Sequence, residues 1–260
     1  MFPVKSVIFL ALAALCSGAP NHHQVSSGKY GITGGTPAQP GQFPYQVSVQ
    51  YCLLGLCEHI CGGAIINETW ILTGAQCAGS ATNVLAGLTN LHDNKTELKV
   101  KFKLPHEGFP TTGLGPNDIG LIQLEEPIQF NEDIQPVKLP KQGEQFNGTA
   151  VFSGYGDIAL PDFNKLTYID GLQLVDFKEC ERALESVIKA TSPLDETSNL
   201  CTLNTESSSC NGDGGGPLVQ NGTVIGLGTW FVQPCGAQGA PNVFTQVASF
   251  VDWINDNMKD

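Results

Sequence analysis

The sequence lacks the features of several common protein classes. No apolar run after Cys16 is long enough to cross a bilayer, which takes about 20 residues. The 260 residues contain no internal repeat, no low-complexity linker and no sign of an additional module. The cysteines form no C-x-x-C pair and no histidine cluster lies near them, which argues against a zinc site.

Basic residues are also scarce. The chain has 13 lysines and arginines, of which Arg182 is the one arginine, against 25 aspartates and glutamates, and its formal net charge is −12. The acidic residues are spread along the chain and do not form a tail. This balance argues against nucleic acids and membranes as partners and is typical of a soluble acidic surface.

The N-terminus has the pattern of a secretory signal peptide. A positively charged start, Met1–Lys5, is followed by the apolar run Ser6–Cys16 and by small residues, which predicts a signal peptide at 1–18 with cleavage after Gly18. The alternative, a membrane anchor, needs a longer apolar run than these eleven residues. The polar stretch 19–31 is interpreted as a propeptide-like segment. The sequence therefore predicts a secreted, extracellular protein.

Removal of Cys16 with the signal peptide leaves eight cysteines. In an oxidising compartment this number indicates four disulfides. The eight are Cys52, Cys57, Cys61, Cys77, Cys180, Cys201, Cys210 and Cys235. Four N-x-S/T sequons support secretion, and each is a candidate glycosylation site. They are Asn67, Asn94, Asn147 and Asn221.

Short apolar or alternating segments recur along the chain, separated by Gly, Pro, Asn and Asp. They predict strands at Phe43–Tyr51, Gly63–Ile66, Trp70–Thr73, Ile119–Leu124, Ala150–Tyr155, Pro217–Val219, Val224–Phe231 and Val243–Val247. Such spacing is typical of a β-barrel or sandwich and not of βαβ units. Helical spacing of apolar residues predicts helices at Phe177–Lys189 and Ala248–Met258.

Three motifs carry a resemblance to a known family. They are C-G-G-A-I-I with W-I-L-T-G-A-Q-C at 61–66 and 70–77, N-D-I-G-L-I at 117–122, and C-N-G-D-G-G-G-P-L at 210–218. In order and separation they resemble the chymotrypsin/trypsin family of serine proteases. The I-T-G-G start at 32–35 and the expected C-terminal helix also fit that family. The resemblance covers 32–260, essentially the whole mature chain.

This resemblance implies an all-β fold of two six-stranded antiparallel β-barrels, with the active site in the cleft between them. The barrels are expected roughly at 32–140 and 141–247 of one domain, with a short helix near 177–189 and a helix at the C-terminus. The resemblance also implies three disulfides, Cys61–Cys77, Cys180–Cys201 and Cys210–Cys235. Cys52 and Cys57 remain, and a local Cys52–Cys57 bridge is expected by elimination.

Two of the three catalytic side chains are missing at the matching positions. Proteases of this family use a serine nucleophile, a histidine base and an aspartate that orients the histidine. This sequence has Gly214, Gln76 and Asp118 at those positions. An amide cannot accept and return a proton near neutral pH, and glycine has no side chain. We interpret Asp118 as a structural acid and the backbone amides of Gly212 and Gly214 as the remnant of an oxyanion hole.

No other serine or histidine matches a catalytic position. The resemblance places Ser207, Ser208 and Ser209 on the wall and floor of the specificity pocket. His59 is near the base position in sequence but one turn earlier in the motif. The remaining histidines, which do not match either, are His22, His23, His92 and His106.

The specificity pocket also departs from the family pattern. Ser208 occupies its base, where an acidic residue would select lysine or arginine. Asn242 and Phe231 stand where the family has glycine, so their side chains are expected to narrow or fill the pocket. The alternative is that the loops shift and leave it open. Thr229 and Trp230 precede Phe231 on the same wall.

The activation site is altered as well. In the family, cleavage after lysine or arginine frees an Ile-type amine, which pairs with the carboxylate beside the nucleophile. Ile32 and Asp213 are the matching pair here, but Tyr30 and Gly31 precede Ile32, and Lys29 is two residues too early. The chain is therefore expected to stay zymogen-like or to be processed by a protease of other specificity.

These departures resemble those of serine protease homologues, inactive family members known notably from insects and mites. No suitable cysteine precedes Cys52, so we expect a single domain without an N-terminal clip domain. The sequence favours a secreted monomer that binds a protein or glycan, for example to modulate protease cascades or to recognise host or microbial targets. Two alternatives stay open: a hydrolase of weak or unconventional activity, and a bulk gut or salivary protein without a specific partner. No cofactor or metal is expected, because acids such as Asp93 and Glu97 are more often just solvated.

Overall fold

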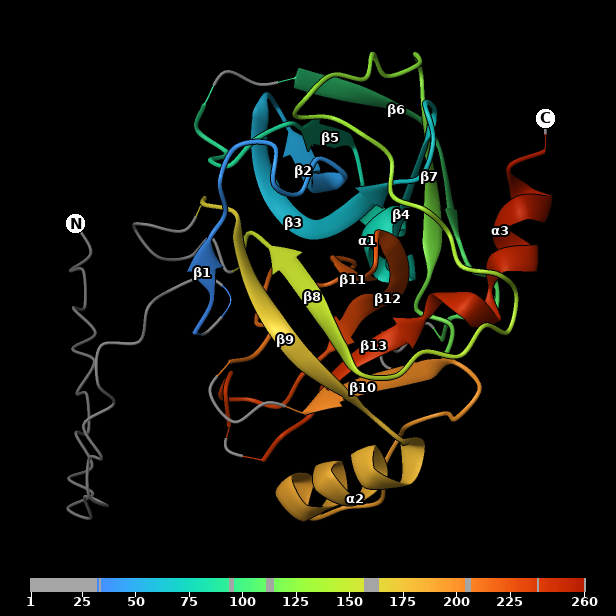
Figure 1. The fold of residues 1–260 in the computed structure, drawn as a ribbon. Helices are drawn as coiled ribbons and strands as arrows, with labels where there is room; N and C mark the ends of the chain where they lie inside the picture. Colours follow the sequence, from blue (N-terminus) through green and yellow to red (C-terminus); the bar gives the residue numbers. More distant parts are fainter. Residues whose placement is uncertain are drawn as a thin grey trace, which may run out of the picture.

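The computed structural model describes residues 32, 34–93, 96–110, 115–156, 164–203, 207–237 and 239–259. The predicted signal peptide, the segment 19–31 and the sequon at Asn94 lie outside the described residues. Within them, two closed six-stranded antiparallel barrels are stacked, one formed by the first half of the chain and one by the second (Figure 1). The fold class predicted from the resemblance is therefore confirmed.

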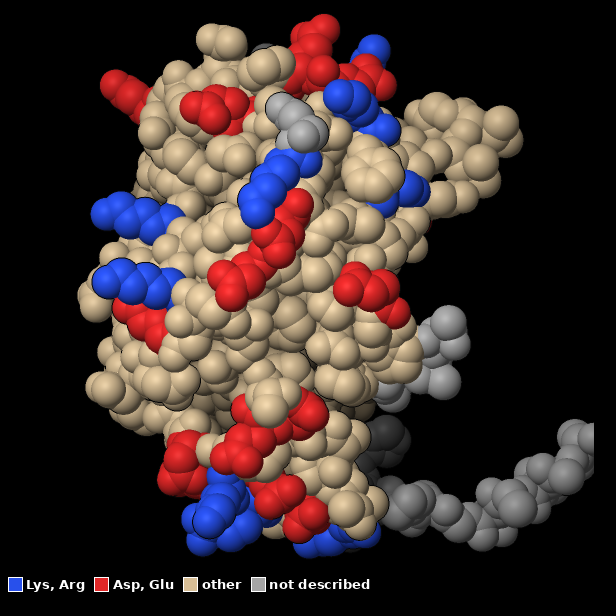
Figure 2. Space-filling model, turned by 90° about the vertical axis from the view of Figure 1, so that its right-hand side faces the viewer, with Lys and Arg blue, Asp and Glu red and all other residues tan. Residues whose placement is uncertain are grey.

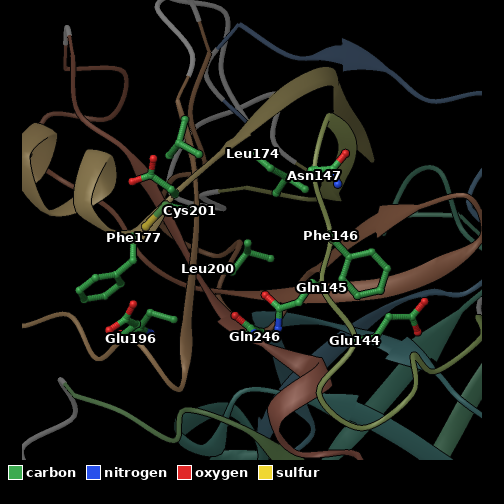
Figure 3. Close-up of a pocket in the computed structure, with 13 residues that line it drawn as sticks. Glu144, Gln145, Phe146, Asn147, Leu174, Phe177, Glu196, Leu200, Cys201 and Gln246 are labelled. Atoms are coloured by element: carbon green, nitrogen blue, oxygen red, sulfur yellow. The ribbon is translucent and has the colours of Figure 1, made fainter.

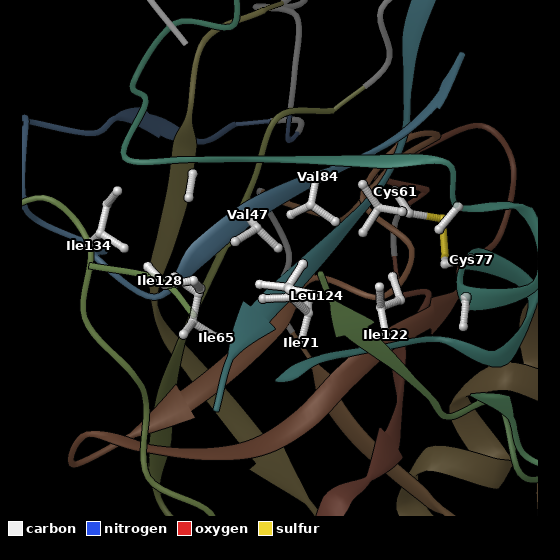
Figure 4. Close-up of a cluster of buried hydrophobic side chains, with 14 residues drawn as sticks. Val47, Cys61, Ile65, Ile71, Cys77, Val84, Ile122, Leu124, Ile128 and Ile134 are labelled. Atoms are coloured by element: carbon white, nitrogen blue, oxygen red, sulfur yellow. A yellow bond between two sulfur atoms is a disulfide. The ribbon is translucent and has the colours of Figure 1, made fainter. Parts of the chain in front are cut away.

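The first barrel closes in the order β2-β3-β4-β7-β6-β5. Its strands are β2 (Gln46–Leu53), β3 (Leu56–Ile65), β4 (Trp70–Thr73), β5 (Asn83–Ala86), β6 (Thr96–Pro105) and β7 (Gly120–Leu124), and α1 (Ala75–Ser80) follows β4. The inward-pointing side chains of alternate residues fill the barrel with aliphatic groups such as Val47, Ile71 and Ile122 (Figure 4). The Cys61–Cys77 disulfide lies at the edge of this core and ties β3 to α1.

The second barrel closes in the order β8-β9-β10-β13-β12-β11. Its strands are β8 (Thr149–Gly154), β9 (Thr167–Val175), β10 (Asn199–Leu203), β11 (Pro217–Gln220), β12 (Thr223–Trp230) and β13 (Asn242–Gln246). A two-residue strand, β1 (Thr36–Pro37), adds to the edge of β9. The start of the described chain is thus attached to the second barrel, although the first barrel follows it directly in sequence.

The helices lie at the periphery of the barrels. The predicted helix near 177–189 is α2 (Phe177–Ile188), which begins at the N-cap Asp176 and ends at Lys189 in the left-handed conformation. The predicted helix 248–258 is wrong in its extent: the segment forms a 3-10 turn, η1 (Val247–Ser249), and then α3 (Val251–Asn257). Within the described residues no helix is long and apolar enough to cross a membrane.

A second core joins the two barrels. Trp70, Leu72 and Leu121 of the first barrel pack in one buried cluster with Leu227 of the second barrel and Ile254 of α3. In Figure 1, α3 lies beside β7 although it ends the chain. This shared packing fixes the relative positions of the loops that meet in the cleft.

The charges of the surface are mixed. On the face shown in Figure 2, acidic and basic side chains are interspersed, and neither sign fills a continuous patch. On this face the acidic residues are thus dispersed among basic ones (Figure 2).

Candidate functional site

Gln76 and Asp118 meet at the junction of the two barrels. Gln76 is the second residue of α1, and Asp118 lies two residues before the buried start of β7. The Asp118 carboxylate accepts hydrogen bonds from Gln76 N at 3.3 Å and from Gln76 Nε2 at 3.4 Å. A shorter bond of 2.7 Å comes from the Thr229 hydroxyl on β12. Three segments that are far apart in sequence therefore converge on one carboxylate.

The environment of Asp118 is nearly dry. Its residue is 2% exposed, and burial raises the pKa of the carboxyl. The hydrogen bonds from Thr229 and from the backbone and side chain of Gln76 act in the opposite direction and lower the pKa. The carboxylate thus depends on neutral donors alone, because no cationic side chain appears among its contacts within the described residues.

Gly214 faces the Gln76 amide across a small gap. A Cβ placed on Gly214 would lie 3.9 Å from Gln76 Nε2 and 3.9 Å from Cys77 Sγ, which are ordinary van der Waals distances. The position therefore has room for a side chain directed at Gln76, and Gly214 is not among the residues with positive φ. The geometry of a nucleophile, base and acid is present, but the first two chemical groups are not.

The backbone around Gly212 has a conformation open to glycine. Gly212 has φ +86°, a value that L side chains rarely adopt. Within the described part of the chain, no hydrogen bond is formed by the backbone N–H of Gly212 or of Gly214. Backbone N–H groups without a protein partner are the kind of donor that a developing oxyanion requires.

His59 supports this loop from behind and is not a substitute base. Its Nε2 lies 2.9 Å from the carbonyl oxygen of Gly212, and its Nδ1 lies 2.8 Å from the Ser48 hydroxyl. Burial lowers the pKa of the ring to about 4. Both ring nitrogens are engaged and the residue is buried, so His59 cannot reach a substrate in the cleft. Sequence reasoning excluded His59 as the base but did not predict this supporting role.

Asn242 binds the serines at the base of the expected specificity pocket. Its Oδ1 accepts hydrogen bonds from Ser208 Oγ at 3.0 Å, Ser209 N at 2.9 Å and Ser209 Oγ at 3.1 Å. All three residues are buried. Asn242 thus ties both serines to β13 through its side-chain oxygen.

The neighbouring wall residues are placed differently from one another. Thr229 directs its hydroxyl to Asp118. Trp230 packs partly against the Cys180–Cys201 region. Phe231, just beyond β12, is half-buried. The bond from Thr229 to the acid had no counterpart in the sequence reasoning, which assigned Thr229 to the pocket alone.

The expected activation pair lies in the second barrel. Ile32 is 1% exposed and belongs to the buried cluster that contains Phe152. Asp213 is buried, and its carboxylate accepts hydrogen bonds from Gly156 N and Cys210 N, both at 2.9 Å. The bond from Gly156 ties the loop that carries Gly212 and Gly214 to the segment that follows β8.

Four disulfides brace the fold. They are Cys52–Cys57, Cys61–Cys77, Cys180–Cys201 and Cys210–Cys235. Cys61–Cys77 and Cys210–Cys235 lie next to the segments that carry Gln76 and Gly214. The bridge Cys52–Cys57 closes the tip of the β2–β3 hairpin.

The described sequons differ in accessibility. Asn67 is half-buried, its Oδ1 accepting from Thr69 N and Trp70 N. Asn147 and Asn221 are exposed, and Gln220 next to Asn221 donates to the Asn147 carbonyl. The two exposed sequons are therefore neighbours on the second barrel.

A separate cavity of about 360 Å³ lies beside the start of α2. Phe146 and Phe177 stand on opposite sides of it, with Leu200, Gln145 and Gln246 between them (Figure 3). None of the residues around Asp118 lines it, so this cavity is not part of the cleft. Among the described residues, no group of three His, Cys, Asp or Glu side chains is placed to hold a metal ion.

Comparison with known proteins gives consistent relatives. The family model described as Trypsin matches residues 32–254. The chain is similar to kallikrein-7 of Homo sapiens, with 36% identity over 236 residues that cover 88% of this chain and 87% of the relative. It is also similar to trypsin II-P29 of Gallus gallus, with 31% identity over 258 residues covering 96% and 98%. A third relative, kallikrein 1-related peptidase b22 of Mus musculus, is 30% identical over 247 residues covering 87% and 89%.

Proposed function

Because this chain belongs to the trypsin family, we propose that it is a secreted, non-catalytic member that acts by binding a protein or glycan ligand. The observation that carries the proposal is the arrangement of Gln76, Asp118 and Gly214. The acid keeps its hydrogen bonds and its position, while a glutamine amide replaces the base and a glycine replaces the nucleophile. The chain thus keeps the backbone arrangement of the site but has neither a serine hydroxyl nor a histidine ring at the two matching positions.

The expected loss of activity is large. Acyl transfer without a triad member retains roughly 10³–10⁴-fold over the water rate, contributed by the oxyanion hole and by binding. Efficient enzymes reach accelerations of about 10⁶–10¹⁷-fold. The backbone amides of Gly212 and Gly214 supply at most this residual acceleration, so we expect peptide hydrolysis to be negligible.

The hydrogen bonds of Asn242 support ligand binding at surfaces other than the specificity pocket. Asn242 takes up the hydrogen bonds of Ser208 and Ser209. A substrate side chain that enters there would have to displace a buried amide whose oxygen accepts three hydrogen bonds, and such displacement leaves polar groups unpaired. We therefore assign ligand binding to the loops and surfaces around the cleft and not to the specificity pocket.

The first test is turnover of broad fluorogenic peptide and ester libraries, combined with labelling by a fluorophosphonate probe for activated serines. The natural chain is expected to show neither turnover nor labelling. Turnover that persists through repurification, or stoichiometric labelling, would contradict the proposal.

A second set of variants separates the triad from the pocket. Gln76→His/Gly214→Ser rebuilds the reacting groups, and adding Asn242→Gly opens the pocket base. We expect the double variant to be labelled by the probe but to remain slow on peptides, and the triple variant to gain at least about tenfold over the double on peptide substrates. Asn242→Gly alone is the matched control and is expected to stay inactive.

A further inference from the structure

The tip of the β2–β3 hairpin is an exposed apolar prong. Six large apolar side chains of the described residues are exposed, and four of them lie on this hairpin. Leu54 is 95% exposed, Leu56 77%, Leu53 58% and Tyr51 45%. No charged residue occurs between Tyr51 and Cys57. A contiguous exposed apolar patch of this kind marks an interaction site on a soluble protein.

The prong is rigid. Cys52 pairs with Cys57 and Leu53 with Leu56 in the strand register, and the disulfide joins the first of these pairs. The two turn residues Leu54 and Gly55 have φ +53° and +84°, as in a two-residue turn of type I′. A Cβ added to Gly55 would meet no atom within 4 Å, so the tip stands clear of the rest of the described chain.

Leucine at position 54 is not explained by the turn. Type I′ turns favour Asn or Gly at both central positions, because L side chains with a Cβ adopt positive φ reluctantly. A leucine that is both strained and almost fully solvated is retained against local preference. Its side chain is available for an apolar contact with another molecule.

One face of the prong continues into a hollow. Directly opposed residues in a sheet point to the same side, and alternate residues share it, so Tyr51, Leu53, Leu56 and Glu58 lie on one face and the disulfide on the other. Tyr51 also lines a hollow of about 630 Å³. Its other lining residues are Ile60, Cys61, Gln76, Gly79, Ser80, Thr82 and Lys103. The prong is therefore one wall of this hollow.

The prong projects, the hollow is recessed, and the two carry charges of opposite sign. The prong is convex and apolar and carries the exposed acid Glu58 at its base. The hollow is concave and partly apolar, and Lys103 is its one charged lining residue among those described. A surface that carries a projection and a matching recess side by side is self-complementary, which is the requirement for a two-fold interface.

We propose that two copies of this chain associate through this face, with the leucine prong of each entering the hollow of the other. Glu58 of each copy then faces Lys103 of the other. Stable interfaces bury about 800 Å² per partner, more than three leucines supply, so the hollow contributes the remainder. This inference does not depend on catalytic inactivity, although the second copy would cover the side of the cleft beside Gln76.

Sedimentation velocity of the purified natural protein over about two decades of concentration tests the association. We expect a monomer–dimer equilibrium that the Leu54→Asn/Leu56→Thr variant abolishes. Leu54→Asn creates the preferred Asn-Gly turn and Leu56→Thr keeps a β-branched strand residue, so this variant is expected to fold and retain the wild-type circular dichroism spectrum. A wild-type chain that stays monomeric, or a dimer that the variant does not weaken, overturns the proposal.

A charge exchange tests the orientation. Glu58→Lys and Lys103→Glu are each expected to raise the dimer Kd by at least about tenfold, and the double variant to recover most of the affinity. Additive losses in the double variant would reject the Glu58–Lys103 contact. Co-sedimentation of monomeric wild type with phosphatidylcholine vesicles, lost in the leucine variant, would assign the prong to a membrane and overturn the second copy as its occupant. Neither result changes the expected outcome of the turnover assay.

Discussion

His59 and Asn242 show how single side chains fix the conformation of the loops around the candidate site. His59 contacts the carbonyl oxygen of Gly212 and so holds the Gly212–Asp213 peptide, whose N–H donates to the Cys210 carbonyl. Asn242 bonds Ser208 and Ser209 and so fixes the floor of the pocket. Both side chains are buried, and neither can be removed without leaving polar partners unpaired.

The depressed pKa of His59 makes stability depend on pH. The folded pKa is about 4 and the ordinary value 6.5, so the unfolded chain takes up a proton first as the pH falls. The stabilisation is present above pH 6.5 and is lost as the pH falls towards 4, on the order of 3 kcal/mol in all. Denaturant unfolding at several pH values is expected to show this slope in the wild type and not in His59→Gln.

A direct measurement complements that comparison. The His59 ring in the native protein is expected to titrate by NMR well below pH 6, if it titrates before acid unfolding. A midpoint near 6.5 in the folded state, or parallel pH curves for the two proteins, would contradict the assigned role.

At the residue scale, the sequence indicated which residues come together at the candidate site better than which hydrogen bonds they form. The spacing of the motifs resembles that of the family and so predicted that Gln76, Asp118 and Gly214 lie close together, as they do in the structure. The motifs left open whether Asn242 fills the pocket or the loops shift, and they did not predict that its amide binds Ser208 and Ser209. That contact is a side-chain hydrogen bond between segments far apart in sequence, as is the bond from Thr229 to Asp118. Such bonds have no periodic signature in sequence.

At the scale of elements, the alternation of apolar and polar residues predicted some strands, and in other strands the same alternation was overlooked. β6 reads as Lys99, Lys101 and Lys103 separated by apolar residues, which is a strand pattern with a charged outer face. It was not among the predicted strands, nor were β5, β9 and β10. The C-terminal segment was expected as one helix because its apolar spacing is helical, yet a 3-10 turn precedes α3 and Phe250 separates the two.

Helix α2 depends on its N-cap. The Asp176 side chain accepts a hydrogen bond from Glu179 N at 2.8 Å, satisfying one of the unpaired amides of the first turn. Asp176→Ala is expected to lower the free energy of unfolding by about 1 kcal/mol. Asp176→Asn keeps the acceptor and is the matched control, expected to stay near wild type in denaturant unfolding. Equal losses in both variants would show that the cap bond is not the cause.

At the scale of the whole molecule, the two barrels are expected to unfold together. Their shared cluster includes Leu72, Leu227 and Ile254, so neither barrel can open without exposing apolar surface of the other. Tryptophan fluorescence and far-ultraviolet circular dichroism are expected to give one coincident transition. Two separated transitions would show that the barrels are independent units.

Helix α3 provides the variant for that test. Ile254 is fully buried, and Ile254→Ala is expected to cost about 2–5 kcal/mol while keeping the transition single. Asp252 is exposed on the same helix, and Asp252→Ala is expected to stay within about 0.5 kcal/mol of wild type. A loss confined to one spectroscopic probe would contradict the shared core.

Under the proposed inactivity, the amide of Asn242 bears on how proteolysis could be regained. Triad members act as a unit, so a histidine without a serine, or a serine without a histidine, restores almost nothing. A chain with both the histidine and the serine would still have Asn242 bonded to Ser208 and Ser209 at the specificity pocket. Selection for proteolysis therefore has no single step to reward, and the lineage is free to drift further from its ancestor. The surface of the molecule, and no longer its cleft, is where selection is expected to have acted most.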